Sequence, residues 1–227
     1  MQPTTAKLPL LALSGLDFEA RIAAGDGVVA VCGVGSAALA ERLAQIAARG
    51  CSGIISFGTA GGLAPTLVPG DCVLADTVVG NSQQSWATDA KWLDALHALL
   101  PHAHLGAIAG VGEPITSVVA KQELWKGSTA LAVDMESHWA AQIAQRHGVP
   151  FAVCRVVVDP AQRSLPSSAM VGLQPDGSTA ILPILRALAA HPGELPALLK
   201  LARDAGAARA SLKRIRAKLG LRFALPA

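Results

Sequence analysis

The chain has 227 residues, of which 52% are hydrophobic (AVILMFWYC) and 15% are charged. Intrinsic disorder requires low hydrophobicity together with high net charge, so this composition excludes a disordered chain. The longest stretch without a charged residue lies between Arg49 and Asp71 and is interrupted by prolines and glycines. Because a transmembrane helix needs about 20 consecutive apolar residues, we expect none.

Length and cysteine usage indicate one domain in a reducing compartment. An α/β domain can reach about 200–250 residues, so we expect a single domain spanning residues 1–227. The four cysteines form no C-x-x-C pair, which favours reduced core residues of a cytoplasmic protein. The apolar stretch Leu8–Leu16 contains Pro9 and leads directly into Asp17, which favours a buried first strand over a signal peptide.

Positive charge is concentrated at the C-terminal end. The whole chain has a formal net charge of +3, whereas residues 191–227 hold eight Lys and Arg residues against two acidic ones. A basic helical tail over about residues 193–220 is typical either of a solvated helix face or of peripheral contact with an anionic membrane. Both interpretations remain open at this point, and nothing indicates binding to nucleic acid.

Short apolar runs alternate with helical patterns along the chain. The apolar runs predict strands at Leu8–Ser14, Val28–Cys32, Gly53–Phe57, Cys72–Val79, Leu105–Val111, Ala130–Val133 and Phe151–Val158. Helices are predicted at Phe18–Ala24, Ala37–Arg49, Asp89–Leu100, Ser137–His147, Thr179–Ala190, Glu194–Ala205 and Ala207–Leu219. This alternation predicts a three-layer α/β fold with a mixed, mostly parallel central β-sheet flanked by helices. Functional groups in such sheets gather at the carboxyl ends of strands.

Two glycine-rich turns follow predicted strands. Gly33–Ala38 matches G-x-G-x-x-A, but no acidic residue follows before Asp71 to hold a ribose, so a dinucleotide site is weakly supported. Backbone N–H groups of such a turn can still face an anion or a polarised water. In the second turn, Ser56–Leu63, small residues allow a ligand to approach the backbone and Thr59 supplies a hydroxyl.

Carboxylates stand at three predicted strand ends. Glu19 follows the first strand, Asp134 and Glu136 precede a helix, and Asp159 ends the most hydrophobic strand. Burial beside that strand would raise the pKa of Asp159, as a general acid requires. Helix capping for the first three and an Asp-Pro turn for Asp159 are the structural alternatives. The histidines lack metal-ligand spacing, so we expect no metal site, and no G-x-S-x-G nucleophile motif is present.

Together these segments resemble the family 1 purine nucleoside phosphorylases and nucleosidases. The resemblance covers roughly residues 8–160 and is carried, in the family's order and spacing, by Gly33–Gly35, Phe57–Leu63 with Pro69–Asp71, Val133–Glu136, and Pro150–Asp159. Within the superfamily the sequence is most similar to the hopanoid-associated phosphorylases, which release adenine from adenosylhopane. The stretches supporting this narrower match are Gly15–Arg21, Asp134–His138 and Asp159–Pro166.

The resemblance implies cleavage of an N-glycosidic bond of an adenine nucleoside, by phosphate or by water, with no cofactor beyond inorganic phosphate as a possible co-substrate. It implies Asp159 as the acid that protonates the base and Glu19 as a second catalytic residue that orients or deprotonates the attacking water. It further implies substrate contacts from Glu136, Met135, Asp134, Thr59, Gly58 and Phe151. Phosphate or water contacts are implied for Gly35, Ser36, Thr59 and, as a compensating cation, Arg21. A homodimer or higher homo-oligomer is implied as well.

Two departures from the family pattern leave open whether water or phosphate is the nucleophile. Hexameric phosphorylases carry an Arg where this chain has Ser56, and the nucleosidases usually place Ser where this chain has Val158. A nucleosidase of the methylthioadenosine/S-adenosylhomocysteine type is therefore the alternative enzyme. The alternative to an enzyme is a nucleoside-binding module without catalytic activity.

Overall fold

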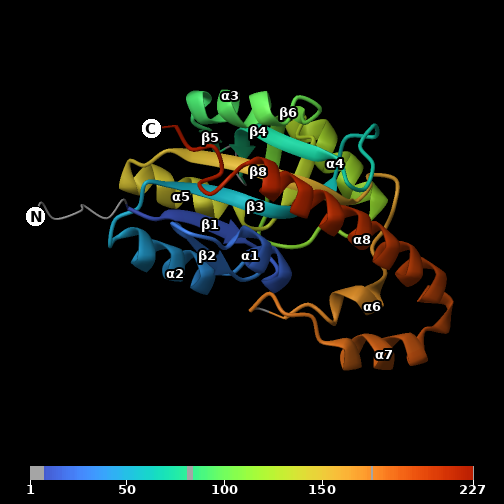
Figure 1. The fold of residues 1–227 in the computed structure, drawn as a ribbon. Coiled ribbons are helices and arrows are strands. Elements are labelled where there is room, and N and C mark those ends of the chain that lie inside the picture. The colour runs from blue at the N-terminus through green and yellow to red at the C-terminus, as the bar shows by residue number, and fades with distance from the viewer. Residues whose placement is uncertain (1–7, 81–83, 175, 227) are drawn as a thin grey trace, which may run out of the picture.

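The computed structural model describes residues 8–80, 84–174 and 176–226, and its core is an eight-stranded sheet (Figure 1). The strands are β1 (Leu10–Ser14), β2 (Val28–Cys32), β3 (Gly53–Gly62), β4 (Cys72–Val79), β5 (Ser85–Ala87), β6 (His104–Gly110), β7 (Ala132–Asp134) and β8 (Phe151–Asp159). The strand order is β2-β1-β3-β7-β6-β4-β5, and β8 pairs with both β3 and β4. β3, β8, β4, β6 and β7 therefore close into a ring, which leaves β1 and β2 as an open extension.

The sheet is mixed. β1 pairs in parallel with β2 and β3, as do β3 with β8, β4 with β6, and β6 with β7. The pairs β3–β7, β4–β8 and β4–β5 are antiparallel. The predicted α/β fold with a mixed, mostly parallel sheet is confirmed, whereas closure into a ring leaves no signature in the strand patterns.

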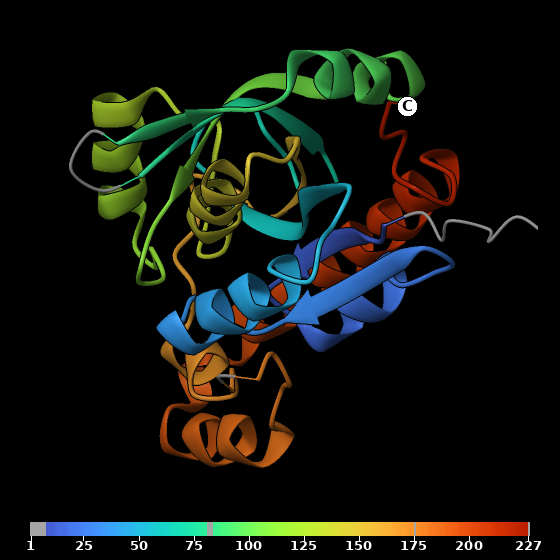
Figure 2. The same ribbon diagram turned by 90° about the vertical axis from the view of Figure 1, so that its left-hand side faces the viewer.

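Helices cover both faces of the sheet. They are α1 (Asp17–Ala23), α2 (Ala37–Ala47), α3 (Ala90–Leu99), α4 (Val118–Ser128), α5 (Ser137–His147), α6 (Ser167–Met170), α7 (Ile181–Ala190) and α8 (Leu195–Lys218), with a 3-10 turn at Pro192–Glu194. Buried side chains of α2 and α5 share one hydrophobic core, and those of α1, α3 and α8 share another. α6 and α7 project from the body below the N-terminal end of α8 (Figures 1 and 2).

Two predicted boundaries are wrong. The glycine-rich segment Ser56–Leu63 is not a turn, because β3 continues to Gly62 and pairs there with β8 and β7. Its glycines lack side chains that would reveal strand alternation. The two helices expected at Glu194–Ala205 and Ala207–Leu219 form the single helix α8, which runs through the exposed Gly206. One glycine costs a helix only about 1 kcal/mol, and α8 recovers this by burying Ala208, Leu212 and Ile215.

Other elements were not predicted at all. The helix α4 is absent from the prediction because Lys121 is its only buried residue, so it has no apolar stripe to recognise. The short strand β5 pairs only with β4, at the end of the sheet. In the described part of the chain, no helix combines the length and the apolar character needed to cross a membrane.

Candidate active site

One apolar cavity lies where the ends of β3, β7 and β8 meet α1. Its volume is about 270 Å³, close to the lower end of the roughly 300–1,000 Å³ usual for small-molecule sites. Its polar lining consists of Glu19, Thr59, Asp134, Glu136, Asp159 and Thr179. Most of the remaining wall is aliphatic and includes Met135, Val158, Leu165, Met170, Leu173 and Leu201. Four of the predicted carboxylates therefore share one cavity.

Glu136 is buried at the start of α5. Its Oε2 accepts a hydrogen bond from Arg155 Nη2 at 3.3 Å, and its Oε1 accepts one from the Gly35 N–H at 3.4 Å. Burial raises the pKa of Glu136 to about 8, although the Arg155 guanidinium acts in the opposite direction. A Cβ at Gly15 would lie 2.9 Å from Glu136 Oε1, so this carboxyl requires a glycine beside it.

Arg155 is fully buried and organises the cavity floor from β8. Its Nε lies 2.8 Å from Asp134 Oδ2, and its Nη2 donates to Ser56 Oγ at 2.6 Å. Asp134 also accepts the Ser137 N–H at 2.9 Å, at the beginning of α5. Asp134 therefore reaches the cavity wall, but its carboxylate is engaged by hydrogen bonds to the start of α5 and by the ion pair with Arg155. Arg155 in turn fixes the orientation of Glu136.

Glu19 is buried and saturated with hydrogen bonds. Its Oε1 accepts from the Thr59 N–H at 2.8 Å and from Thr59 Oγ1 at 2.6 Å. Its Oε2 accepts from the N–H groups of Gly15 at 3.1 Å and Leu16 at 3.0 Å. These four donors hold the carboxyl group in place and connect β1, α1 and β3 at the cavity. A water that uses Glu19 as a base must displace one of them.

Asp159 forms a buried ion pair with Lys121 of α4. Lys121 Nζ also donates to the carbonyl oxygens of Pro160 at 3.0 Å and Arg163 at 2.9 Å, so all three ammonium hydrogens are used. Burial raises the pKa of Asp159, and the charges of Lys121 and Arg163 counteract this effect. The site thus holds a carboxyl that retains a proton more strongly than an exposed aspartate does.

A β-bulge in β8 turns Asp159 toward the cavity. Ala60 of β3 faces Val157, whereas the next residue, Gly61, faces Asp159, so Val158 has no partner on β3. Side chains of a regular strand alternate between its two faces, but here the neighbouring Val158 and Asp159 both line the cavity.

Several predicted site residues lie elsewhere. The side chain of Arg21 is 75% exposed and pairs with Asp17, so it does not supply a cation to the cavity. Phe151 begins β8, eight residues before Asp159, which at about 3.3 Å per residue places it some 26 Å from the acid. Ser36 caps α2 by accepting the Leu39 N–H at 3.2 Å.

Two predicted glycines support the site without lining the cavity. The N–H of Gly35 is already donated to Glu136, and the backbone of Gly35 has φ +40°, a conformation that favours glycine. A Cβ at Gly58 would collide with Glu19 and lie 2.7 Å from Arg155 Nη1. Thr59 and Met135 do line the cavity, as predicted.

Sequence reasoning assigned no role to Lys121 or Arg155. Arg155 stands four residues before Asp159 in an otherwise apolar strand, and an unexplained charge in a buried run is a detectable signal. Lys121 gives no such signal, because charged and apolar residues are mixed throughout Val118–Ser128. Across residues 8–80, 84–174 and 176–226, no three His, Cys, Asp or Glu side chains are grouped so as to hold a metal ion.

Comparison with known proteins identifies the family. A family model described as the phosphorylase superfamily matches residues 14–174. The chain belongs to this superfamily. It is accordingly an enzyme of the nucleosidase and phosphorylase type. The matched range contains all the carboxylates of the cavity and ends before α7.

Solved structures share the fold. A putative 5'-methylthioadenosine/S-adenosylhomocysteine nucleosidase from Francisella philomiragia matches with a TM-score of 0.66 and 16% identity, over 93% of this chain and 96% of that one. Futalosine hydrolase of Helicobacter pylori matches with a TM-score of 0.63 and 16% identity, over 92% and 97%. S-adenosylhomocysteine nucleosidase from Streptococcus pyogenes matches with a TM-score of 0.62 and 20% identity, over 70% and 86%.

Proposed function

We propose that this phosphorylase-superfamily enzyme cleaves the N-glycosidic bond of a 5'-substituted adenine nucleoside and releases adenine. The observation that carries the proposal is the presence of Asp159 and Glu136, both buried, in the wall of one apolar cavity. A nucleoside offers such a cavity a base to protonate, a sugar with hydroxyl groups to hold, and a bond between them that breaks. The resemblance assigns these same two positions to the same tasks.

Asp159 is the general acid of the proposed reaction. Bond cleavage leaves negative charge on the departing base and oxocarbenium character on the sugar. A proton delivered from Asp159 to N7 of adenine neutralises the base, and burial, which raises the pKa of Asp159, favours the protonated form that this step needs. Val158, which lines the cavity beside the acid, offers the base an apolar contact where the nucleosidases usually carry Ser.

Glu136 and Met135 hold the sugar. Ionised Glu136 accepts hydrogen bonds from the ribose hydroxyl groups, and Met135 packs against the ring. Glu19 acts at the nucleophile side, where it orients the attacking water or contacts the sugar when phosphate attacks. Its link to Thr59, through both the N–H and the hydroxyl, fixes the carboxylate before substrate binds.

The proposed reaction includes both water and phosphate as candidate nucleophiles. Among the described residues that line the cavity there is no Lys or Arg, and Arg21 points away from it. Phosphate would therefore have to compete with Glu19 for the N–H and hydroxyl donors of Thr59, whereas water needs no cation. The product identifies the nucleophile, because hydrolysis yields a free ribosyl compound and phosphorolysis yields its 1-phosphate.

The 5' substituent is proposed to be large and apolar, as in adenosylhopane, which places the reaction in hopanoid biosynthesis. The apolar wall formed by Leu165, Met170, Leu173 and Leu201 supports such a group, because apolar side chains favour contact with an apolar substituent. All four residues belong to the part of the chain that follows β8. The alternative is a nucleosidase with a small 5'-thio substituent, which the fold of the solved nucleosidases supports. The two differ in the 5' group that is turned over fastest.

The test is release of adenine from a matched set of nucleosides. Purified protein is incubated with adenosine, 5'-methylthioadenosine, S-adenosylhomocysteine and 5'-alkyl adenosines of increasing chain length, with and without phosphate. We expect adenine release to increase with the length of the apolar chain. A preference for 5'-methylthioadenosine selects the alternative enzyme, and no release from any nucleoside rejects the proposal.

Two variants assign the roles. Asp159→Asn cannot donate a proton, so we expect a loss of about 100-fold or more in turnover while nucleoside binding persists. Leu173→Ala removes part of the apolar wall, so it should slow adenine release from the long-chain 5'-alkyl adenosines more than release from adenosine. Binding of adenosine without cleavage by the unmodified protein would support a binding module in place of an enzyme.

A further inference from the structure

Helix α7 is almost entirely apolar, yet much of its surface is uncovered. Pro183, Ile184, Ala187 and Leu188 are partly covered, and the helix contacts α6. Its sequence, Ile181–Ala190, contains a single charged residue, Arg186, and none of its residues is buried. Ile181 is 68% exposed, Leu182 56% and Leu185 55%. A helix that is hydrophobic all round normally lies inside a protein or in lipid. The exposed apolar residues of α7 therefore have no covering partner among the described residues.

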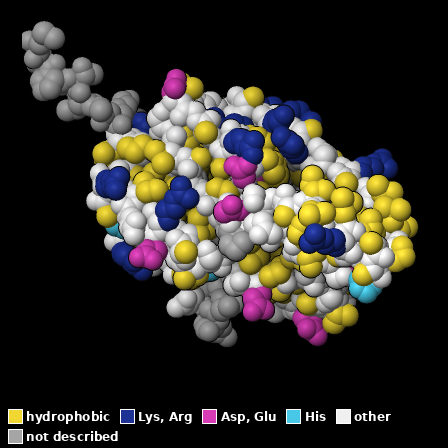
Figure 3. All heavy atoms as spheres, turned by 90° about the horizontal axis from the view of Figure 1, so that it is seen from below, with side chains coloured by type: hydrophobic (Ala, Val, Ile, Leu, Met, Phe, Trp, Pro, Cys, Tyr) yellow, Lys and Arg dark blue, Asp and Glu magenta, His cyan; other side chains and the backbone are white. Residues whose placement is uncertain are grey.

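The exposed apolar residues of this region form one surface. Six of the thirteen large hydrophobic side chains exposed in the described residues fall within residues 171–199, and we call them the α7 surface: Val171, Ile181, Leu182, Leu185, Leu195 and Leu199. Hydrophobic side chains gather on the side of the molecule where α7 lies (Figure 3). Monomeric proteins rarely expose large contiguous apolar patches unless they bind a protein or a membrane there.

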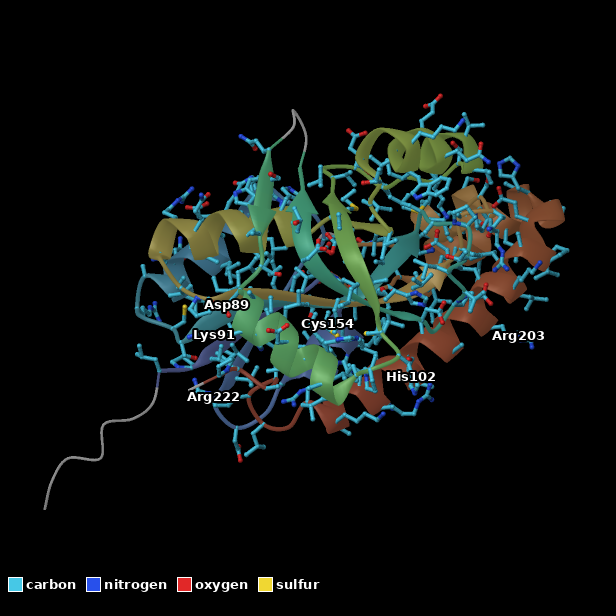
Figure 4. The ribbon with its side chains drawn as sticks, turned by 90° about the horizontal axis from the view of Figure 1, so that it is seen from above. Asp89, Lys91, His102, Cys154, Arg203 and Arg222 are labelled. Atoms are coloured by element: carbon cyan, nitrogen blue, oxygen red, sulfur yellow. The ribbon has the colours of Figure 1, made fainter. Side chains whose placement is uncertain are left out.

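Positive charge accompanies the α7 surface. Arg186, Lys200 and Arg203 are exposed, and among the described residues none of the three has an acidic partner within 4.0 Å. Arg203 lies on the outer side of α8 (Figure 4). The nearby carboxylate of Glu194 is engaged by Ser167 Oγ at 2.8 Å and the Ser168 N–H at 2.9 Å, so it holds α6 in place.

We propose that the α7 surface docks on an anionic lipid bilayer. An interfacial helix buries its apolar face at the boundary of headgroups and acyl chains, while neighbouring Lys and Arg residues meet the lipid phosphates. A second copy of this chain fits less well, because a two-fold contact brings the same surface of both copies together and sets their cations opposite each other. The basic C-terminal half of α8 is a different surface, since it packs on β8 through Ser211, Leu212 and Ile215.

Docking by α7 would place the cavity beside the membrane. Met170, Leu173 and Leu201 line the cavity, and their neighbours Val171 and Leu199 belong to the α7 surface. The same segment thus forms the apolar wall of the site and the proposed contact with lipid. A nucleoside with an apolar tail could pass from bilayer to cavity without exposing that tail to water. This last step rests on the proposed function, whereas the docking itself does not.

The test is co-sedimentation of the full chain with vesicles of phosphatidylcholine, alone or mixed with phosphatidylglycerol. We expect binding that is stronger to the mixed vesicles. Leu182→Glu/Leu185→Glu should weaken it by about tenfold or more for each leucine that leaves the lipid. Arg186→Glu/Lys200→Glu should remove the preference for phosphatidylglycerol, at about fivefold for each charge.

The matched control is Leu99→Glu/Leu221→Glu, which changes two exposed leucines outside the α7 surface and should bind vesicles as the unmodified protein does. Lys213→Glu/Lys218→Glu tests the basic half of α8. Binding that depends on Lys213 and Lys218 but not on Leu182 and Leu185 overturns the proposal, as does absence of binding to either vesicle. A dimer that Leu182→Glu/Leu185→Glu converts to a monomer in light scattering also overturns it, because the surface then joins two copies.

The vesicle experiment tests docking independently of the proposed reaction. Co-sedimentation needs no turnover, so a protein that binds vesicles but releases no adenine contradicts only the proposed function. Thermal unfolding of each variant shows that it is folded, which we expect because α7 has no buried residue. Leu182→Ser/Leu185→Ser, a milder polar change, should lower vesicle binding in the same direction.

Discussion

Replacing Lys121 by Met should shift the pH dependence of the reaction. Lys121 is fully buried, pairs with Asp159 and donates to the Pro160 and Arg163 carbonyl oxygens. Methionine has a similar length but neither charge nor donors. The carboxyl of Asp159 then remains buried without its counter-charge, so its pKa must rise further.

The size of the expected shift in the pKa of Asp159 follows from its contact with Lys121. An opposite charge in contact lowers the pKa of a carboxyl by about 1–3 units, so losing Lys121 should raise the pKa of Asp159 by about that amount. Because a general acid works only when protonated, the rate falls as pH rises through its pKa. This alkaline limit should therefore move about 1–3 units higher in Lys121→Met.

The stability change has a defined sign as well. Removing one partner of a buried ion pair costs about 3–5 kcal/mol when the remaining charge stays buried. The folded state of Lys121→Met holds a proton on Asp159 at pH values where the unfolded state has lost it. Its stability should therefore decrease as pH rises from the ordinary pKa of aspartate to the raised pKa of Asp159. The penalty is smaller at pH 5 than at pH 8.

The assay is adenine release from a 5'-substituted adenosine across the pH range, with urea unfolding at pH 5 and pH 8. Lys121→Arg, which keeps the charge, is the matched control and should restore the alkaline limit of the unmodified enzyme. A merely structural role for Lys121 would change stability and leave the pH limit in place. An unshifted limit in an active Lys121→Met would refute the reasoning.

Three further predictions concern the cavity. Gly58→Ala places a Cβ 2.7 Å from Arg155 Nη1 and should lower the free energy of unfolding by about 1–3 kcal/mol, measured in urea, with loss of turnover; unchanged stability would mean that the strand relaxes freely. Arg21→Ala should leave the dependence of rate on phosphate unchanged, because that side chain is 75% exposed; a raised KM for phosphate would contradict this. In an Asp159→Asn background, nucleoside affinity should rise as pH passes about 8 and Glu136 ionises, and calorimetry should show that Glu136→Gln lacks this rise.

Much of the fold could be predicted because buried strands carry a local signal. β1 and β8 are continuous apolar runs, and the acids that follow or end such strands were assigned to one site on that basis. The glycines of β3 led to the prediction of a turn, because glycine has no side chain that could show the alternation typical of a strand. Ring closure was unpredictable for a related reason: it depends on β8 pairing with both β3 and β4, and no residue pattern within β8 records its partners.

Within the candidate site, the predicted residues that lie away from the cavity do so for geometric reasons. Arg21 was expected to supply a compensating cation for phosphate. It stands two residues after Glu19 on α1, and residues two apart on a helix point in different directions, so only Glu19 lines the cavity. Phe151 shares a strand with Asp159 but stands at its opposite end. Lys121 lies 38 residues before Asp159 in the sequence, and only the folded chain brings the two together.

The bulge at Val158 gives the strand two consecutive side chains on the cavity, where a regular strand would offer one. The proposed proton donation by Asp159 and the apolar contact beside it are consequently carried by two different residues. Substitution at Val158 can alter which base is accepted while the acid keeps its ion pair. Asp159, by contrast, cannot move along the strand without losing Lys121. Under the proposed function, substitution at this edge of the sheet would therefore change selectivity for the base while the acid keeps its position.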